Sequence, residues 1–270
     1  MSKKVYNKAL TIAGSDSGGG AGIQADLKTF SALACYGSSV IVALTAQNTK
    51  AVTDIHVPEP EFVRSQIKAV LEDIGADAVK LGMLVSADMI KAVAEELKRF
   101  EVRNVVLDPV MVAKSGDKLL QDDAREALVQ ELFPLSKVIT PNIKEAEVLA
   151  GRSITTFEEM EQAGRELLDT GAEAVVMKGG HLESETSSKD ALITGGEVRW
   201  FDGKRVATQN THGTGCTFSS AITAYLAQGT TLAEAVNGAK QYMTGAIGSG
   251  ATYKIGEGHG PVHHFYQFWG

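Results

Sequence analysis

Short apolar runs alternate with longer amphipathic stretches along most of the 270 residues of this chain. The apolar runs are rich in valine, isoleucine and leucine and have the length of buried strands, whereas the stretches between them have the patterning of helices. This alternation favours an α/β fold with a mostly parallel central sheet, because a parallel neighbour is reached through a crossover helix. The predicted strands are 9–13, 39–44, 78–81, 105–107, 138–139 and 174–177, and the predicted helices are 21–33, 61–74, 87–100, 122–132 and 157–169.

A single domain spanning residues 1–270 is predicted, because no change of composition and no linker rich in proline or serine divides the chain. A chain of this length buries roughly three quarters of its unfolded surface, so its core needs no disulfide or metal. One segment departs from the alternation, since Thr194-Gly195-Gly196-Glu197 lies between two strand-like runs, 191–193 and 198–201. This pattern predicts a β-hairpin near one edge of the sheet.

The charge and the cysteines narrow the class of protein. A net charge of −7 opposes binding to nucleic acid or to anionic lipid, since both are polyanions. The two cysteines, Cys35 and Cys216, lie far apart, which is typical of a reducing cytosol and argues against a structural zinc site. No signal peptide or membrane span is evident. We therefore expect a cytoplasmic protein without a nucleic-acid or membrane partner.

Polar or glycine residues follow several of the predicted strands. In an open parallel sheet, ligands bind where the strands end, because the loops and the helix N-termini converge there on one crevice. Strand ends also collect polar loop residues for no functional reason, so the convergence of many such positions is the argument. These positions are Asp16, Gln47, Asn48, Gly82, Met83, Asp108, Asn142, Glu145 and Lys178.

A glycine-rich turn, Thr211-His212-Gly213-Thr214-Gly215-Cys216, directly precedes an apolar stretch of helical length that ends near Gly229. Glycines at this point let consecutive backbone N–H groups point at one anion, with the positive end of the helix behind them. This geometry suits a phosphate, although a lone Gly-x-Gly also occurs at ordinary helix starts. Gly213, Thr214 and Gly215 are therefore candidates to hold a transferring phosphoryl group.

Cys216 is the candidate catalytic base. It would lie in the first turn of the helix, where the helix dipole lowers the pKa of a thiol. A group placed there can take a proton from an attacking hydroxyl while the neighbouring amides hold the phosphoryl group. The alternative is a buried apolar contact, which is the commoner role of a cysteine among small residues.

A second glycine loop runs from Ala13 to Ile23. Its spacing does not match the dinucleotide fingerprint, and Gln47-Asn48 stands where an acidic residue would hold a ribose. No Gly-x-x-x-x-Gly-Lys-Ser/Thr occurs, which excludes an ordinary P-loop. The backbone of this loop is therefore predicted to approach a small, flat ligand closely.

Four side chains near this loop are candidates to contact that ligand. Asp26 follows Gly22 by one helical turn and is expected to face either solvent or the mouth of the crevice. The amide of Gln47 both donates and accepts, which matches the edge of an aminopyrimidine or pyridine ring. Met83 and Val110 would supply apolar walls. Ordinary packing or surface exposure remains the alternative for each of the four.

The longer motifs of the chain, in sequence order, are 9–30, 45–49, 80–84, 106–111, 139–142, 177–181 and the turn at Gly213. Together they resemble the hydroxymethylpyrimidine/phosphomethylpyrimidine kinases of thiamine biosynthesis, within the ribokinase-like superfamily. The resemblance covers essentially the whole chain and implies a three-layer α/β/α sandwich.

The resemblance also implies roles for individual residues. ATP phosphates would bind at the Gly213 turn, with Cys216 as the base, where many ribokinase-like enzymes carry aspartate. Asp108 and Glu145 would surround Mg²⁺. The pyrimidine would lie near Gly14, Ala21, Asp26, Gln47, Met83 and Val110. Asn142, Lys178, Thr211 and Lys240 would serve ATP and its phosphates.

The activity implied is ATP-dependent phosphorylation of 4-amino-5-hydroxymethyl-2-methylpyrimidine to its monophosphate and then to the diphosphate, by a homodimer. Pyridoxal kinase is the nearest alternative, because pyridoxal also presents a flat ring with a hydroxymethyl group. A non-catalytic pyrimidine-binding protein and a cysteine hydrolase are further alternatives, although the hydrolase lacks an evident orienting partner for His212. Three histidines in the tail, His259, His263 and His264, are expected to pack rather than to bind a metal.

Overall fold

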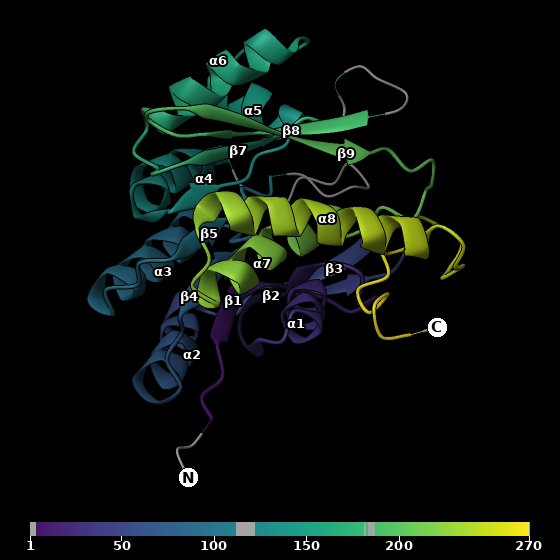
Figure 1. The fold of residues 1–270 in the computed structure, drawn as a ribbon. Helices are drawn as coiled ribbons and strands as arrows, with labels where there is room; N and C mark the ends of the chain where they lie inside the picture. The colour runs from purple at the N-terminus through teal and green to yellow at the C-terminus, as the bar shows by residue number, and fades with distance from the viewer. Residues whose placement is uncertain (1–3, 112–121, 181, 183–186, 270) are drawn as a thin grey trace.

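A computed structural model describes residues 4–111, 122–180, 182 and 187–269, and one nine-stranded sheet runs through it (Figure 1). His181, the last residue of one segment that carries the resemblance, lies outside the described residues. The strand order is β3-β2-β1-β4-β5-β6-β7-β8-β9. The strands are β1 (Lys8–Asp16), β2 (Tyr36–Gln47), β3 (Val52–His56), β4 (Ala78–Leu81), β5 (Val105–Leu107), β6 (Val138–Ile139), β7 (Val175–Lys178), β8 (Ser187–Ile193) and β9 (Val198–Lys204).

The centre of the sheet is parallel, as the alternation of strands and helices predicts. β1 pairs in parallel with β2 and β4, and the parallel pairing continues through β5, β6 and β7. β8 and β9 pair antiparallel at one edge, which confirms the predicted hairpin. The opposite edge is β3, which pairs antiparallel with β2. β3 was not predicted, because most of its residues are exposed and carry no apolar pattern.

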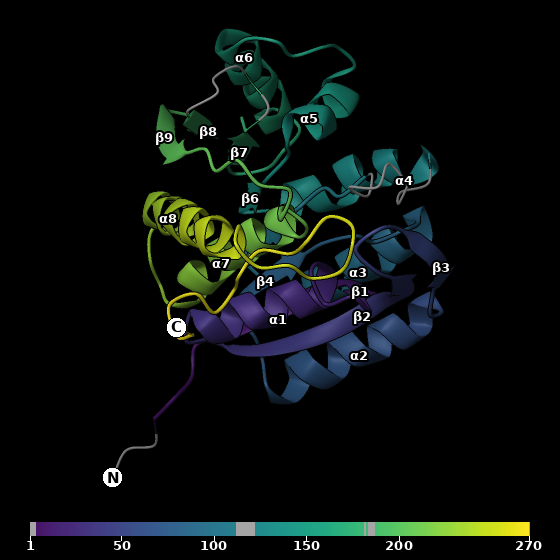
Figure 2. The same ribbon diagram turned by 90° about the vertical axis from the view of Figure 1, so that its right-hand side faces the viewer.

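Helices cover both faces of the sheet, so the three-layer α/β/α arrangement is confirmed (Figures 1 and 2). Helices α1, α7 and α8 pack on one face, and α2 to α6 pack on the other. None of the helices in the described part of the chain has the length and hydropathy of a membrane span. Their bounds are α1 (Gly22–Ala32), α2 (Pro60–Asp73), α3 (Ala87–Arg99), α4 (Asp122–Ala127), α5 (Ile143–Ala150), α6 (Phe157–Leu168), α7 (Thr214–Ala227) and α8 (Leu232–Gly250).

Alternate residues of the central strands face the two helical layers. In β5, Val105 and Leu107 join the core beneath α2 to α6, whereas Val106 between them joins the core beneath α1, α7 and α8. The period of two follows from the pleat, which sends successive side chains to opposite faces. Burial on both faces explains why these strands are continuous apolar runs in the sequence.

Two helical segments differ from the sequence-based prediction. The predicted helix 122–132 ends as α4 at Ala127 and continues as a π-helical turn, Leu128–Leu132. α5 was not predicted as a helix, because its eight residues are too few to show a clear period. It starts immediately after the end of β6 and thereby carries Asn142 and Glu145 to the edge of the sheet where the parallel strands end.

A C-terminal strap, residues 251–269, returns across this end of the sheet after α8. The backbone N–H of His259 donates to the Thr49 carbonyl, and the N–H of His212 donates to the Gly260 carbonyl. The strap therefore joins the loop after β2 to the segment that leads into α7. Its position beside both segments can be followed in Figure 2.

Candidate active site

Gly213 opens helix α7, as the sequence predicts. Its backbone has φ 78°, in the left-handed region, and it occupies the N-cap position before Thr214. An added Cβ would collide with the carbonyl oxygen of Gly20, so both the conformation and the space require glycine here. Among the described residues, the N–H groups of Gly215 and Cys216 have no hydrogen-bond acceptor. These groups can bind an anion at the positive end of the helix.

The loop between β1 and α1 lies directly against the Gly213 turn, and Asp16 joins the two. Its carboxylate accepts hydrogen bonds from the backbone N–H groups of Gly18, Gly20 and Ala21 and lies 2.8 Å from His212 Nε2. Burial alone would raise the pKa of Asp16, but its bonds to His212, Ala21 and Gly18 lower it overall. The two glycine-rich segments therefore form one rigid wall.

Gln47 lies at the end of β2, beside the same histidine. Its Nε2 is 3.4 Å from His212 Nε2, and its Oε1 accepts a hydrogen bond of 3.1 Å from the Thr45 hydroxyl. These contacts fix the orientation of the amide that was predicted to read a ring edge. Sequence reasoning considered His212 only for a hydrolase and missed that it positions Gln47.

Apolar groups surround the end of β1. Met83 packs on Gly14, where an added Cβ would come within 2.5 Å of the Met83 methyl carbon. Gly14 thus leaves room for the Met83 side chain in this position. Val110 is half-buried and follows Asp108, whose carbonyl accepts a hydrogen bond from the Val110 N–H at 2.8 Å.

A lysine and two carboxylates form a charged group on the other side of the Gly213 turn. Lys178 Nζ lies 2.9 Å from Asp108 Oδ1 and 3.9 Å from Glu145 Oε2. Burial and the charge of Asp108 raise the pKa of Glu145 to about 7, although Lys178 acts in the opposite direction. Burial would lower the pKa of Lys178, but the charges of Asp108 and Glu145 outweigh it and raise the pKa.

Asn142 and Glu145 hold the start of α5 through a capping box. The Asn142 side chain accepts from the Glu145 N–H at 3.0 Å, and Glu145 Oε2 accepts from the Asn142 N–H at 2.7 Å. Asn142 also forms a parallel bridge with Lys178 at the end of β7. The local signal for this arrangement is the sequence Asn142-Ile143-Lys144-Glu145, which has the spacing of a capping box.

The charged group fits Mg²⁺ only in a limited way. Within the described residues no three His, Cys, Asp or Glu side chains come together as a metal-binding group. Two carboxylates, Asp108 and Glu145, share a single lysine, so the site carries excess negative charge that a divalent cation would neutralise. Mg²⁺ typically takes one or two protein carboxylates and completes its shell with water and phosphate oxygens. The residues present suit an ion of that kind, held largely by ATP.

Cys216 is half-buried in the first turn of α7, but its protonation differs from the expectation. Burial raises its pKa to about 11, and the charges of Asp26 and Asp108 add to the effect, whereas Lys80 acts against it. The prediction that the helix N-terminus lowers the pKa of this thiol is therefore wrong. The cause is tertiary, because desolvation and two carboxylates outweigh the opposing effects of Lys80 and the Gly22 N–H.

Asp26 faces neither solvent nor an open cleft, since its carboxylate is fully buried. It forms an ion pair of 2.9 Å with Lys80, which is also fully buried, and accepts hydrogen bonds from the hydroxyls of Thr11 and Ser220. Sequence reasoning missed Lys80 as the partner of Asp26. The available signal was a lone charge inside the apolar run 78–81, because a buried charge requires a partner.

Lys240 lies on α8, and its charge is already paired. Its Nζ is 2.6 Å from Asp190 Oδ2 and 3.1 Å from the Ser188 hydroxyl. Asp190 also accepts the N–H of Gly179, just after Lys178. The ammonium is therefore not free to act as a phosphate-binding cation in this arrangement. Thr211 is another of the four residues predicted to serve ATP and its phosphates, and its carbonyl accepts a hydrogen bond from the Thr214 hydroxyl.

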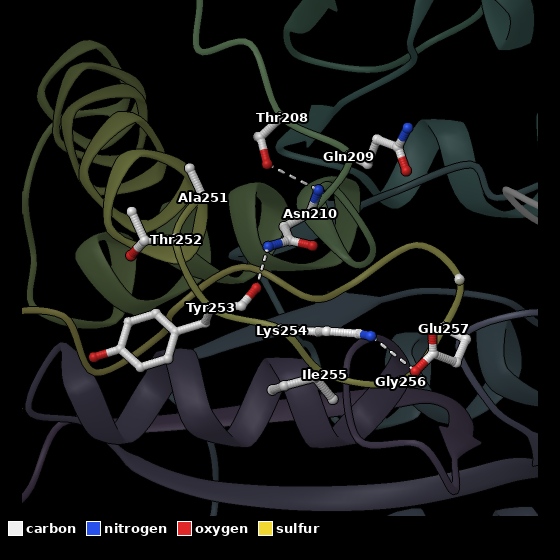
Figure 3. A pocket seen from close by; sticks show the side chains of 11 residues that line it. Thr208, Gln209, Asn210, Ala251, Thr252, Tyr253, Lys254, Ile255, Gly256 and Glu257 are labelled. Carbon is white, nitrogen blue, oxygen red and sulfur yellow. Dashed lines mark hydrogen bonds and ion pairs between the residues drawn. The ribbon is translucent and has the colours of Figure 1, made fainter.

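A surface pocket of about 420 Å³ lies between the segment before Gly213 and the C-terminal strap (Figure 3). Asn210 Nδ2 donates to the carbonyls of Gly250 and Tyr253, each at 2.7 Å. Lys254 and Glu257 form an ion pair on its rim. The wall of this pocket anchors the chain that leads into the Gly213 turn.

Histidines outside the Gly213 turn make separate packing contacts. The ring of His264 is buried and lies 3.0 Å from the Thr217 hydroxyl, and the ring of His263 packs against Tyr253 and Trp269. His212 has an orienting partner after all, Asp16, which corrects the objection raised against a hydrolase. Asp16 and Gln47 both contact Nε2 of His212, however. These contacts direct that nitrogen toward the loop between β1 and α1.

Comparison with known proteins places the chain among kinases. A family model described as phosphomethylpyrimidine kinase matches residues 16–263. The chain belongs to this family. A hydroxymethylpyrimidine/phosphomethylpyrimidine kinase from Rhizobium meliloti (strain 1021) is 52% identical over 97% of this chain and 98% of its own length.

Solved structures agree with this assignment. A phosphomethylpyrimidine kinase from Clostridium difficile 630 has a TM-score of 0.79 and 48% identity, covering 89% of this chain and 99% of its own. A pyridoxal kinase from Bacillus subtilis, solved as an ADP complex, has a TM-score of 0.90 and 38% identity over 97% of this chain and 99% of its own. The protein is therefore a kinase with the ribokinase-like fold, and the hydrolase and the non-catalytic binding protein are set aside.

Proposed function

We propose that this phosphomethylpyrimidine kinase transfers the γ-phosphoryl group of ATP to the hydroxymethyl oxygen of 4-amino-5-hydroxymethyl-2-methylpyrimidine, and a second phosphoryl group to the resulting monophosphate. The observation that carries the proposal is the direct contact of the Gly213 turn with the loop that bears Asp16 and Gly20. An anion-binding helix start is thereby adjacent to a backbone surface that suits a flat ring. The names of the Rhizobium and Clostridium relatives support the same substrate.

The residues divide into two groups around the reacting phosphorus. The turn of Gly213, Thr214 and Gly215 holds the transferring phosphoryl group, with Cys216 beside the attacking oxygen. Asp108 and Glu145 would hold Mg²⁺, which would neutralise phosphate charge when bound. The pyrimidine contacts are Gly14, Ala21, Gln47, Met83 and Val110, and the buried Asp26 supports them from the interior. The nucleotide contacts are Asn142, Lys178, Thr211 and the region of α8 around Lys240.

In the first step, the hydroxymethyl oxygen forms a bond to the γ-phosphorus while the bond from that phosphorus to the bridging oxygen breaks. The electron pair of the broken bond leaves with ADP, and the hydroxyl proton moves to the Cys216 thiolate. In the second step the acceptor is a phosphate oxygen that is already ionised, so no proton acceptor is needed. One site thus performs two transfers that differ in their requirement for a base.

Asp26 supports the substrate site from the buried interior, without being exposed to the substrate. Its carboxylate is neutralised by Lys80 and bonded to Thr11 and Ser220, so it fixes the start of α1 against α7. A substrate amino group approaching Asp26 would compete with these existing bonds. We therefore assign Gln47, which lies at the surface of the site, as the main reader of the ring edge.

Product analysis by mass spectrometry tests the proposed function. The protein is incubated with ATP, Mg²⁺ and either the pyrimidine alcohol or pyridoxal, and the phosphorylated products are identified. A pyrimidine diphosphate is the expected product. The pyridoxal kinase alternative, which the 38% identical Bacillus subtilis relative keeps open, makes a different prediction. It would be favoured if kcat/KM were higher for pyridoxal than for the pyrimidine alcohol and no pyrimidine diphosphate formed.

A further inference from the structure

Two buried ion pairs flank the first turn of α7. Asp108 and Lys178 lie on the side of Gly215, where an added Cβ would be 3.4 Å from Asp108 Oδ2 and 3.5 Å from Lys178 Nζ. Asp26 and Lys80 lie on the side of Ser220, whose hydroxyl donates to Asp26 Oδ1 at 2.7 Å. The first pair belongs to the proposed phosphate side of the site. The Lys80 ammonium of the second pair has no chemical role in the mechanism described so far.

The Asp26–Lys80 pair is built from four elements of the fold. Lys80 Nζ on β4 donates to both oxygens of Asp26 on α1, at 3.0 and 2.9 Å. Thr11 on β1 and Ser220 on α7 donate to the same carboxylate at 2.7 Å each. All four residues are fully buried. Burial of a lysine this complete is costly unless the partner is fixed, so the position of Lys80 is determined by the surrounding structure.

The pair lies on the same face of α7 as Cys216. Ser220 follows Cys216 by four residues, and residues at this spacing are neighbours on one face of a helix. Gly82, just beyond β4, leaves space at the ammonium, because an added Cβ would lie 2.8 Å from Lys80 Nζ. The N–H of Gly22, at the start of α1, also points toward the Cys216 sulfur. The start of α1 and the start of α7 therefore meet at the thiol. One helical turn further along both helices, Asp26 meets Ser220 and carries Lys80 with it.

Four charged groups act on Cys216 from the elements packed around it. Asp26 and Asp108 oppose a negative charge on the sulfur, and Lys80 and Lys178 favour one. Lys178 is shared by two carboxylates, Asp108 and Glu145. Lys80 is bonded to one carboxylate, Asp26, whose charge is also met by two hydroxyl donors, and the charge of Lys80 also acts on Cys216 and Asp108. Lys80 is thus the cation that most favours a negative charge on the sulfur.

We propose that Lys80, held in place by Asp26, is a positioning residue that stabilises the negative charge of the Cys216 thiolate. The thiolate sulfur then accepts the proton of the substrate hydroxyl. Lys80 keeps its own protons throughout, and the only proton that moves is that of the substrate hydroxyl, which passes to the sulfur. The inference rests on the proposed function, in which Cys216 is the base of the first transfer. It also makes a prediction about the thiol that is independent of turnover.

That prediction is tested by alkylating the folded protein with iodoacetamide across a pH series and measuring modification of Cys216 by peptide mass. Lys80→Met is expected to slow alkylation at pH 9 by about tenfold, because loss of one nearby cation raises the pKa of a thiol by about one unit. Asp26→Asn is expected to accelerate it by a similar factor, because a repelling carboxylate is removed. If Lys80 and Asp26 had a purely structural role, both substitutions would change the alkylation rate of Cys216 in the same direction. That result would overturn the proposal.

Asp26→Asn keeps the proposal testable if Lys80→Met fails to fold. Leu97→Ala, which opens a cavity in the core on the opposite face of the sheet, serves as the control for general destabilisation and should leave alkylation within about twofold. Unchanged or slower alkylation in Asp26→Asn would refute the inference.

Turnover gives the second readout. Lys80→Met should slow the first phosphoryl transfer at least about tenfold more than the second, and should have no further effect on the first in a Cys216→Ala background. Equal losses in both transfers would contradict a role through Cys216. If the wild-type protein does not phosphorylate the pyrimidine alcohol, the proposed function fails, whereas the alkylation series still decides the role of Lys80.

Discussion

The first phosphoryl transfer should accelerate about tenfold for each pH unit between about pH 7 and 10, while the second transfer stays nearly independent of pH. The perturbation is pH alone, applied to the unmodified protein. The two transfers share ATP, the Gly213 turn and the charged group of Asp108, Glu145 and Lys178. They differ in one respect, since only the alcohol must lose a proton to Cys216.

The magnitude follows from the raised pKa of this thiol. Because burial raises the pKa of Cys216 to about 11, the sulfur is protonated at neutral pH. At pH 8 about one molecule in a thousand carries a thiolate, which corresponds to a cost of about 4 kcal/mol. The thiolate fraction rises tenfold with each pH unit until the pH approaches the pKa, so the rate of a step that needs the thiolate rises in proportion.

The assay couples ADP release to a spectroscopic signal, with the alcohol or the monophosphate as the saturating acceptor. The second transfer serves as the internal control, because it reports any effect of pH on ATP, on Mg²⁺ or on the fold. Cys216→Asp supplies an ionised carboxylate at neutral pH and should flatten the profile of the first transfer. Parallel pH profiles for the two transfers, or a flat profile for the first, would refute Cys216 as the base.

Three further outcomes are expected. Gly213→Ala should lower kcat of both transfers by about 100-fold in steady-state assays, because a Cβ there strains the backbone and displaces the phosphate-binding amides. Near-normal rates would exclude the turn as the reaction centre. Thr156→Ala removes the capping box of α6 and should lower the free energy of unfolding in urea by about 1 kcal/mol with activity unchanged. Asp16→Asn should destabilise the protein at pH 7 but much less in acid well below 3.8, the ordinary pKa of an aspartate. Because the folded pKa of Asp16 is lowered, its stabilising contribution is present above its unfolded pKa and is lost as the pH falls through the folded pKa. Equal destabilisation at both pH values, measured by chemical denaturation, would show that the carboxylate charge is not the cause.

Local patterns determined most of the fold. The central strands, their helices and the hairpin of β8 and β9 follow from apolar periodicity and turn residues, which act over a few positions of the chain. The Gly213 turn was predicted for the same reason, since a glycine before a helix is a local signal. β3 and α5 were not, because an exposed edge strand and a helix of eight residues carry little periodicity.

Tertiary structure decided the chemistry of the site. Lys80 meets Asp26 across 54 positions of sequence, and His212 meets Asp16 across 196. The sequence indicates that Lys80 needs a partner, but it identifies neither pairing, because the packing of distant elements decides which charges meet. The same packing raises the pKa of Cys216, which was expected to be lowered. The sequence predicts that Cys216 lies at a helix start, but its pKa depends on desolvation and on carboxylates that only the folded chain brings near it.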